Sequence, residues 1–572
     1  MRKIIIWIFG LAAVVASSWT LFHTGFFRVH DYVHAARIAE MLRALQDGHF
    51  PVRWTSNFGF GYGMPLFEFY APLPYYIGAL VYWLGFDIIL SIKFLFLLCS
   101  VLTFIGMYFL GAKLFGRAGG ILSAVALTVA PYRAVNLFVR GALSEAWGIM
   151  AIPWVLLGIV KVIRREKYGW HVLLFGYVAL FLSHNITTLL FAPISMMFAG
   201  GFWLYEQWRI GKVKLNAFLP LVNLVLTTIL AVGLCAFYLF PAYLEKDFTR
   251  VDGIFTGYFH YTNHFLYVRQ FFEDRWGYGG SAPWPYNGLS YFMGYGQFFA
   301  GGVTCLLVGW SIVQVLRKKI SRSILRQVFF FFVLVGALLF SAFMMTFKSQ
   351  FIWDRLPFMV VVQFPWRWLS SAATLLALIG GMGTIFIRSS WRRYVYVAVV
   401  SIFMLLTNYN FFRPEFYLND PEKFYYTDPK LIRIYMSQVL NDYVPRQIAF
   451  LPEPALQTAT TKSKYGMVKI LIDRVQEKLI QTNFTEPNEQ FELYIADFPG
   501  WKLYLDGVEM KKKLGPNGDY LINVPAGEHL VAAQFTDSPI RYWSDVASGI
   551  SLIALLCLLI GTTYQKRYNQ NS

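Results

Sequence analysis

Residues 91–111 read SIKFLFLLCSVLTFIGMYFLG, and Lys93 is the one charged side chain among them. A helix of about 20 apolar residues is long enough to cross the hydrocarbon core of a bilayer. Similar blocks recur through much of the chain, which has 572 residues and is 57% hydrophobic and 14% charged. Soluble domains carry about 25% charged residues. The composition therefore excludes a set of soluble domains and predicts a polytopic α-helical membrane protein.

The net charge of +18 raises the question of a polyanionic partner such as nucleic acid. The positions of the charges argue against one, because basic residues gather in short segments between apolar blocks, the mark of cytoplasmic loops. Those segments hold Arg2, Lys3, Lys113, Arg117, Lys161, Arg164, Arg165, Lys167, Arg209, Lys212, Lys214, Arg317, Lys318, Lys319, Arg322, Arg326, Arg388, Arg392, Arg393, Lys566 and Arg567. We expect membrane lipid and no nucleic acid as a partner, with both termini in the cytoplasm.

These basic markers divide the apolar blocks into about twelve expected crossings. They are residues 4–22, 91–111, 119–138, 143–160, 169–184, 187–205, 216–240, 291–316, 327–347, 366–387, 394–411 and 543–563. A cleaved signal peptide is the alternative for residues 4–22, but an anchor is favoured because further membrane helices follow. Residues 72–86 are apolar but short, and a crossing there would reverse every later loop. We expect them to be interfacial or re-entrant on the outer face.

Three long segments are expected outside the membrane. Residues 23–90 and 241–290 form large outer loops of a transmembrane domain that covers residues 1–411. Residues 412–542 form an extracytoplasmic β-sandwich-like domain, because FELYIADF, KLYLDGVEM, DYLINVP and EHLVAAQF alternate like strands and Asp506-Gly507 is a hairpin signal. Residues 543–572 add the last transmembrane helix and a short cytoplasmic tail.

Ionisable residues are dense directly after the first apolar block, where His30, Asp31 and His34 lie close together in sequence. Desolvating such groups beside a membrane is costly, so they are candidates for function. Residues 31–46 have helical character, and Asp31 and His34 would share a face of that helix. Asp31 has a second reading as the cap of the helix.

Several motifs together resemble a bacterial membrane protein family called 6-pyruvoyl-tetrahydropterin synthase-related, over about residues 20–410. The motifs are His30–His34, Gly48–Trp54, Gly59–Pro65, Ala130–Arg133, Arg140–Glu145, Leu182–Thr187, Ala236–Tyr238, Trp276–Ser281 and Gln363–Arg367. The family name implies no activity, since nothing here resembles the compact αβ fold of the soluble zinc enzyme. The family is similar to the GT-C glycosyltransferases, which take a sugar from a polyprenyl-phosphate carrier at the outer membrane face. Residues 497–529 further resemble the end of YfhO-like membrane proteins.

The resemblance implies a GT-C-like fold and a general base at Asp31, an acidic residue early in the first outer loop. Asp31 would deprotonate the acceptor hydroxyl while the sugar leaves its phosphate with inversion. The departing phosphate requires cations, and Arg367 leads because arginine binds phosphate in a bidentate fashion. The other outer-face candidates are Arg37, Arg53, Arg133, Arg140, His184, His264 and Arg269. His30, His34, Glu145 and His184 are candidate supporting residues, and Trp54, Tyr62, Tyr70, Trp276 and Tyr278 are candidates for stacking on sugars.

Each assignment has a structural alternative. His184 is also compatible with a hydrogen bond between helices, Arg133 and Arg140 with snorkelling, and the aromatic residues with the interfacial belt. The leading interpretation is a bacterial cytoplasmic-membrane glycosyltransferase that uses a polyprenyl-phosphate sugar donor and a glycan or envelope-polymer acceptor. A lipid or polysaccharide transporter (flippase) and a non-catalytic envelope assembly protein are the alternatives. No cofactor is certain, and a divalent cation, Mg or Mn, stays open.

Overall fold

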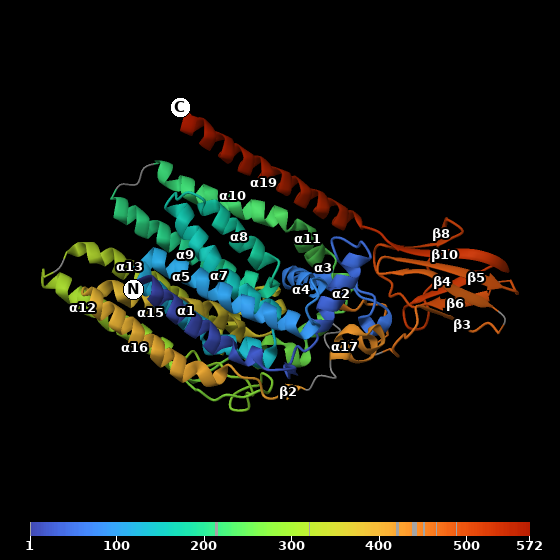
Figure 1. Cartoon of the computed structure of the whole chain (residues 1–572), viewed down its shortest axis with the longest axis horizontal. Coiled ribbons are helices and arrows are strands. Elements are labelled where there is room, and N and C mark those ends of the chain that lie inside the picture. The colour runs from blue at the N-terminus through green and yellow to red at the C-terminus, as the bar shows by residue number, and fades with distance from the viewer. Residues whose placement is uncertain are drawn as a thin grey trace. The chain divides into compact units, whose positions relative to one another are not determined.

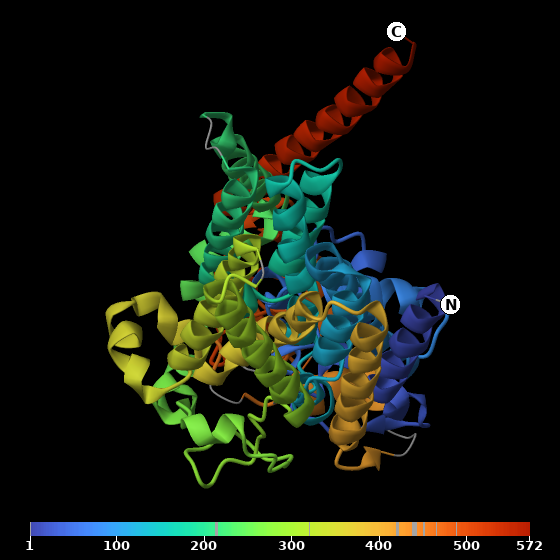
Figure 2. The same ribbon diagram turned by 90° about the vertical axis from the view of Figure 1, so that its left-hand side faces the viewer.

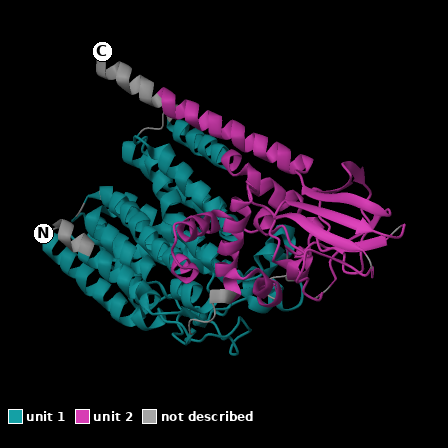
Figure 3. Ribbon diagram, turned by 45° about the vertical axis from the view of Figure 1, so that its right-hand side comes forward, with its two compact units in different colours: residues 1–32, 93–231, 255–419 teal, residues 33–92, 232–254, 420–572 magenta. Residues whose placement is uncertain are grey.

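The computed structural model describes residues 2–211, 215–319, 321–418, 423–437, 443–449, 452–464, 466–487 and 489–571. Lys212 and Lys214, two of the basic loop markers, lie outside these residues. The chain forms two compact units, each assembled from separate stretches of sequence (Figure 3). Unit 1 contains residues 1–32, 93–231 and 255–419, and unit 2 contains residues 33–92, 232–254 and 420–572.

Among the described residues, eight helices are long and apolar enough to cross a membrane, or nine if a bent pair is one span. The predicted polytopic helical fold is confirmed, and the number of twelve crossings stays a prediction. The eight are α5 (Ile88–Thr128), α7 (Leu143–Ile163), α9 (Asn185–Ile210), α12 (Tyr295–Leu316), α13 (Leu325–Met344), residues 365–386 around α15 (Leu369–Met382), α16 (Ser390–Asn408) and α19 (Pro539–Asn571).

Helix α5 covers two of the expected crossings because its backbone breaks at Gly116, where φ is 79° and ψ is 173°. Beyond the break, Gly120 returns to the first half of the helix. A Cβ atom on Gly120 would lie 2.7 Å from the Ala112 amide nitrogen and 2.8 Å from the Tyr108 carbonyl oxygen. Only glycine permits so close an approach of two backbones. Residues 91–111 and 119–128 therefore form a helical hairpin.

The remaining expected crossings are shorter or bent. Residues 4–22 fall in α1 (Arg2–Ser18), and residues 169–184 in α8 (Gly169–Phe181), which packs closely on α7. Residues 216–240 fall in α10 (Leu219–Leu234) and α11 (Ala236–Leu244), the pair that is bent by 74°. The short segment 72–86 contains α4 (Leu73–Trp83).

Figures 1 and 2 show the helices of unit 1 as a bundle in two views, and α7 and residues 365–386 are the most enclosed of its long apolar helices within the described residues. The most apolar windows of α7 and of residues 365–386 are each 89% buried, against 28% for α12 and α16. Helix α15 contacts both α12 and α13. Strand β1 (Phe26–Phe27) pairs antiparallel with β2 (Tyr417–Leu418) and joins the two ends of the unit. Polar residues on α7 and before α15 are therefore held in the most enclosed part of the unit.

Unit 2 contains the β-rich C-terminal region, which confirms the strands expected there. A five-stranded sheet has the order β4-β5-β10-β7-β8, and a three-stranded sheet has the order β3-β6-β9, with antiparallel pairing throughout. The bounds are β3 (Ala459–Thr461), β4 (Met467–Arg474), β5 (Glu477–Phe484), β6 (Glu489–Leu493), β7 (Trp501–Leu505), β8 (Val508–Met510), β9 (Tyr520–Val524) and β10 (Gly527–Phe535). Asp506 and Gly507 both have positive φ and make the expected β7–β8 hairpin turn.

Residues 33–92 pack with the C-terminal strands of unit 2, which is why this unit crosses the expected boundary at residue 411. The Ala496 amide donates to the Tyr62 carbonyl at 2.7 Å, and the Ala455 amide donates to the Phe60 carbonyl at 2.8 Å. The helices of this stretch are α2 (His34–Gln46), α3 (Leu66–Phe69) and α4.

Candidate active site

Glu145 is the centre of a buried ionic cluster in unit 1. It lies in the first turn of α7 and is 2% exposed. Tyr132 donates its hydroxyl proton to Oε1 of Glu145, and Arg140 Nη1 donates to Oε2 at 2.7 Å. Arg367 Nε lies 3.5 Å from the same Oε2. Burying a carboxylate is tolerable only with such partners, so Glu145 holds two arginines in place.

The local backbone explains why Arg140 reaches Glu145. A short π-helix, η3 (Val135–Arg140), ends in Gly141 with φ of 66°, and α7 begins two residues later. The turn is packed tightly, because a Cβ on Gly141 would lie 2.6 Å from Val29 Cγ2. Arg140 also donates to Asn136 Oδ1 at 2.5 Å and lies over the Trp366 ring at 4.8 Å. Its guanidinium is therefore fixed beside the carboxylate.

Arg367 reaches the cluster from a different part of the chain, the 3₁₀ turn η13 (Pro365–Trp368) that precedes α15. Its Nη1 donates to the Val362 carbonyl at 2.8 Å. Its Nε is buried and has no hydrogen-bond partner within the described part of the chain. The predicted motif around Arg367 thus brings into the cluster one cationic N–H group, Nε–H, that makes no hydrogen bond with the described residues.

Asp31 joins the same cluster through the backbone. Its amide donates to the Arg140 carbonyl at 2.8 Å, and the amide of His30 donates to the Val139 carbonyl at 3.1 Å. The Asp31 side chain is half-buried and interacts electrostatically with Arg140 and Arg367. Its carboxylate accepts no hydrogen bond from any residue that the structure describes. The residue at the cap of α2 is Val33, which makes no side-chain capping bond, so Asp31 does not serve as that cap.

The charges of the cluster do not cancel without Asp31. Arg140 and Arg367 carry two positive charges, and Glu145 carries one negative charge against them. An isolated buried charge is strongly unfavourable. The excess positive charge is therefore available to Asp31 or to an anionic ligand that binds beside it.

His184 lies in the break between α8 and α9 and interacts electrostatically with Glu145, Arg140 and Arg367. His264 also interacts electrostatically with Arg367, but both of its ring nitrogens make hydrogen bonds. They contact Ser281 Oγ at 2.8 Å and the Tyr258 carbonyl at 2.6 Å. His184 is thus the more available of the two histidines.

The other predicted residues of unit 1 are held away from this cluster. Arg133 donates to the Thr128 carbonyl and to Ser100 Oγ, both on α5. The Arg269 side chain is 62% exposed, pairs with Glu273 and lies over the Trp284 ring. His30 Nε2 contacts the Tyr278 carbonyl at 2.8 Å, Tyr278 donates to the Arg413 carbonyl, and Trp276 stacks on Phe411.

Six residues predicted together with Asp31 belong to unit 2. His34 Nδ1 contacts the Tyr75 hydroxyl at 2.7 Å, and Arg37 lies 4.1 Å from the centre of the Tyr70 ring. Trp54 is 1% exposed and packs against Trp501 and Phe535, and Tyr62 packs edge-on against Tyr494. These rings are covered by protein side chains and are not open to a sugar.

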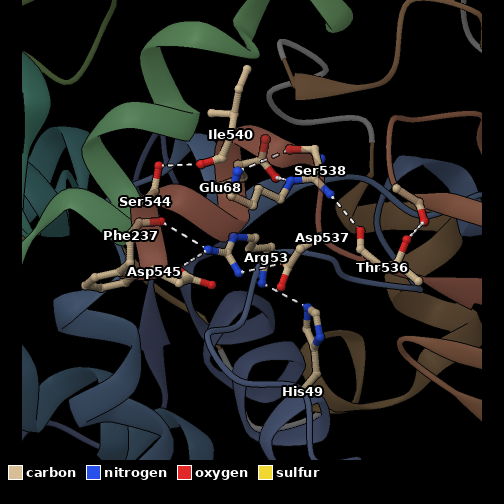
Figure 4. Close-up of polar contacts among 12 residues, drawn as sticks. His49, Arg53, Glu68, Phe237, Thr536, Asp537, Ser538, Ile540, Ser544 and Asp545 are labelled. Atoms are coloured by element: carbon tan, nitrogen blue, oxygen red, sulfur yellow. Dashed lines mark hydrogen bonds and ion pairs between the residues drawn. The ribbon is translucent and has the colours of Figure 1, made fainter. Parts of the chain in front are cut away.

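Arg53, the sixth, belongs to a second ionic cluster (Figure 4). Its Nη2 donates to Asp545 Oδ1 at 2.6 Å, and its Nη1 lies 3.5 Å from Asp537 Oδ1. The same region of unit 2 contains a buried Arg541 that pairs with Glu68 and Glu245. This triad was not predicted from the sequence, although Arg541 is a charge at the start of an apolar block, which is a usable signal.

His49, beside Arg53 in Figure 4, predicts a pH dependence of stability. Its Nε2 accepts the backbone N–H groups of Arg53 and Trp54 at 3.1 and 3.3 Å, which requires an unprotonated nitrogen. Burial, reinforced by the charges of Arg53 and Arg541, lowers the pKa of His49 to about 4. The unfolded chain, with a histidine pKa of about 6.5, binds the proton more readily.

The stabilising contribution of neutral His49 is therefore complete above about pH 6.5 and is lost as the pH falls towards about 4. The measurement is the thermal unfolding midpoint of the purified protein at several pH values between 7.5 and 4.5. His49→Gln keeps an acceptor oxygen but does not titrate, so it should flatten this part of the profile. Equal pH dependence of the two proteins would refute the assignment.

Within the described residues, no group of three or more His, Cys, Asp and Glu side chains is placed to hold a metal ion. Asp31 and Glu145 are the carboxylates of the cluster, and Glu145 is occupied by its arginines and Tyr132. A divalent cation such as Mg or Mn would therefore take most of its ligands from substrate and water.

One curated relative is similar to part of this chain. An uncharacterized protein of Lactococcus lactis subsp. cremoris (strain MG1363) is 25% identical over 227 residues, which cover 38% of this chain and 36% of that protein. The match thus spans little more than a third of that relative.

Two solved structures are similar at low identity. Arabinofuranosyltransferase AftD from Mycobacteria has a TM-score of 0.43 and 15% identity, covering 72% of this chain and 26% of that chain. The second is oligosaccharyltransferase AglB from Archaeoglobus fulgidus, in complex with an inhibitory peptide and a dolichol-phosphate. It has a TM-score of 0.40 and 12% identity, and the match covers 75% of this chain and 59% of that chain. Residues 67–266 match the family model "6-pyruvoyl-tetrahydropterin synthase related domain; membrane protein", and the resemblance that the motifs predicted is confirmed over these residues.

Proposed function

We propose that the protein is an integral-membrane glycosyltransferase that moves a sugar from a polyprenyl-phosphate-linked donor to a cell-envelope acceptor at the outer face of the bacterial cytoplasmic membrane. The observation that carries the proposal is the contrast between two neighbouring carboxylates. Glu145 is occupied by Tyr132, Arg140 and Arg367. Asp31 is half-buried and its carboxylate is not hydrogen-bonded by the described residues, so it is free to act as a base.

The reaction is a single displacement. The acceptor oxygen attacks the anomeric carbon, and its proton passes to Asp31. The bond between that carbon and the phosphate oxygen breaks, and the phosphate leaves with the electron pair. Attack from the face opposite the leaving group inverts the anomeric configuration. The negative charge moves from Asp31 to the phosphate.

Arg140 and Arg367 support this redistribution of charge. The departing phosphate gains a negative charge, and the cluster has one more positive charge than Glu145 can balance. Fixed cations in a site that excludes water stabilise such a charge without reorganising. Arg367 Nε is buried, lies 3.5 Å from Glu145 Oε2 and makes no hydrogen bond with the described residues, so a phosphate oxygen can accept one from it.

The experiment uses the purified protein in lipid nanodiscs with polyprenyl-phosphate-linked sugar and isolated envelope glycan. Release of polyprenyl phosphate and labelling of the glycan report transfer. Arg367→Met should lower kcat by about 10²–10³-fold, the loss seen when one preorganised donor to a developing oxyanion is removed.

Arg269→Met is the matched control, because Arg269 is exposed and pairs with Glu273 outside the cluster. It should transfer at nearly the wild-type rate. Comparable thermal midpoints of the two variants would show that the loss is not unfolding. An Arg367→Met protein as active as Arg269→Met would contradict the proposed site.

A further inference from the structure

The ring of His184 is oriented by the helix that follows it. His184 is the N-cap of α9, and its Nδ1 accepts the Thr187 amide proton at 3.1 Å. The Thr187 hydroxyl lies 2.7 Å from the same nitrogen. A ring nitrogen that accepts a backbone N–H carries no proton of its own. The Thr187 hydroxyl therefore donates as well, and the proton of the neutral ring is on Nε2.

Helix α7 brings this ring to the arginine cluster. Gly148 lies three residues after Glu145 and so on the same face of the helix. A Cβ on Gly148 would lie 3.1 Å from the Cβ atoms of both His184 and Thr187. Because Gly148 has no side chain, the N-terminal cap of α9 can pack against the face of α7 that carries Glu145.

His184 interacts electrostatically with three charged groups: Glu145 of α7, Arg367 of η13 and Arg140 of η3. A ring whose Nδ1 accepts the backbone N–H of Thr187 is not the imidazolium ion. The ring is therefore neutral at physiological pH. The residue is partly exposed, and the hydrogen bonds that the described residues make with its ring are both at Nδ1.

We propose that His184 is a neutral hydrogen-bond donor that holds, through Nε2–H, a phosphate oxygen bound between Arg140 and Arg367. The inference rests on the proposed function, of which it names one further ligand-binding residue. A phosphate oxygen is an acceptor, and the two arginines supply the charge that attracts it. A neutral donor adds a directed hydrogen bond without burying a third cation. His184 transfers no proton, since the phosphate leaves as a stable anion.

The chain offers a variant that separates this role from capping. Asparagine is among the best N-cap residues, so His184→Asn keeps an acceptor for the Thr187 amide. Its side chain is too short to present a donor at the position of Nε2. His184→Ala removes both the cap and the donor. Binding is measured with undecaprenyl phosphate in nanodiscs and, separately, with inorganic phosphate.

We expect His184→Asn to keep the wild-type thermal midpoint and to bind undecaprenyl phosphate about tenfold more weakly, by the same factor at pH 6 and pH 8. His184→Ala should lose the same affinity and also some thermal stability. A parallel loss of affinity for inorganic phosphate identifies the free phosphate group as the ligand. A loss confined to undecaprenyl phosphate identifies the lipid-linked form. If His184→Asn bound both probes as tightly as wild type, the proposal would be overturned and His184 would be only a helix cap.

A second readout does not involve a ligand. In protein labelled with ¹⁵N-histidine, the resonances of His184 are those that disappear in the His184→Asn variant. They should show a protonated Nε2 and an unprotonated Nδ1 from pH 5 to pH 8. An imidazolium or the Nδ1–H tautomer in this range would also overturn the proposal. The two claims fail separately. Phosphate binding that depends on His184 without any sugar transfer refutes only the proposed function, and sugar transfer with His184-independent binding refutes only this inference.

Discussion

The Asp31→Asn protein is expected to lose sugar transfer by about 10²–10⁴-fold, the range that a positioned general base contributes. The amide has nearly the shape of the carboxylate but cannot take the acceptor proton. The backbone amide of residue 31 still pairs with the Arg140 carbonyl, so the loop keeps its position. The measurement is kcat for transfer, with donor binding determined separately on the same protein.

Donor binding distinguishes a lost base from a lost fold. The variant removes a negative charge from beside two arginines, so its affinity for polyprenyl phosphate should stay the same or rise. Asp247→Asn, at a side chain that is 77% exposed in unit 2, is the matched control and should leave kcat unchanged. Full activity in the Asp31→Asn protein would exclude Asp31 as the base.

The second large effect is expected at Arg541, whose replacement by Met should destabilise unit 2 by about 3–5 kcal/mol. Arg541 is 0% exposed. Its Nε lies 2.9 Å from Glu68 Oε2, and its Nη2 lies 2.8 Å from Glu245 Oε2. Ser538 also donates to Glu245. Without the guanidinium, two buried carboxyl groups would face each other with no cation between them.

The protonation of this pair is asymmetric. Burial raises the pKa of Glu68 well above its usual range. The pKa of Glu245 is lowered despite its burial, because Glu68, Arg541 and Ser538 hydrogen-bond its charged form. Glu68 is therefore the protonated member and Glu245 the ion that pairs with Arg541. One cation and one anion balance within the triad.

The test compares Arg541→Met with a triple variant that also carries Glu68→Gln and Glu245→Gln. Removing the two acids together with the cation leaves no unpaired buried charge, so the triple variant should recover most of the lost stability. Unfolding by denaturant in nanodiscs, followed by tryptophan fluorescence, gives the midpoints. A single variant as stable as wild type, or a triple variant less stable than the single, would contradict this account of the triad.

The elements that were predictable from sequence are those fixed by local patterns. Apolar length and basic loops located α7, α9 and both halves of the α5 hairpin. The Asp506-Gly507 pair located the β7–β8 turn, since two positive φ values are needed there. Strands β4 and β5 were not predicted individually.

The site was predictable only in part, for a physical reason. Arg140 and Glu145 share one motif, and a single turn at Gly141 joins them. Residues 34–62 are close to Asp31 in sequence, but they pack with the C-terminal strands in unit 2. Contacts between distant parts of the chain, such as Arg367 with Glu145 or Arg541 with Glu68, depend on packing that no local pattern records.

The most direct test of the central claim is an experimental structure of the protein with bound polyprenyl phosphate in nanodiscs. We predict phosphate density within hydrogen-bonding distance of Arg140 and Arg367, on the side of the cluster that Asp31 occupies. Phosphate bound elsewhere, with the Arg140–Glu145–Arg367 cluster unliganded and Asp31 remote from the lipid, would contradict the proposed active site.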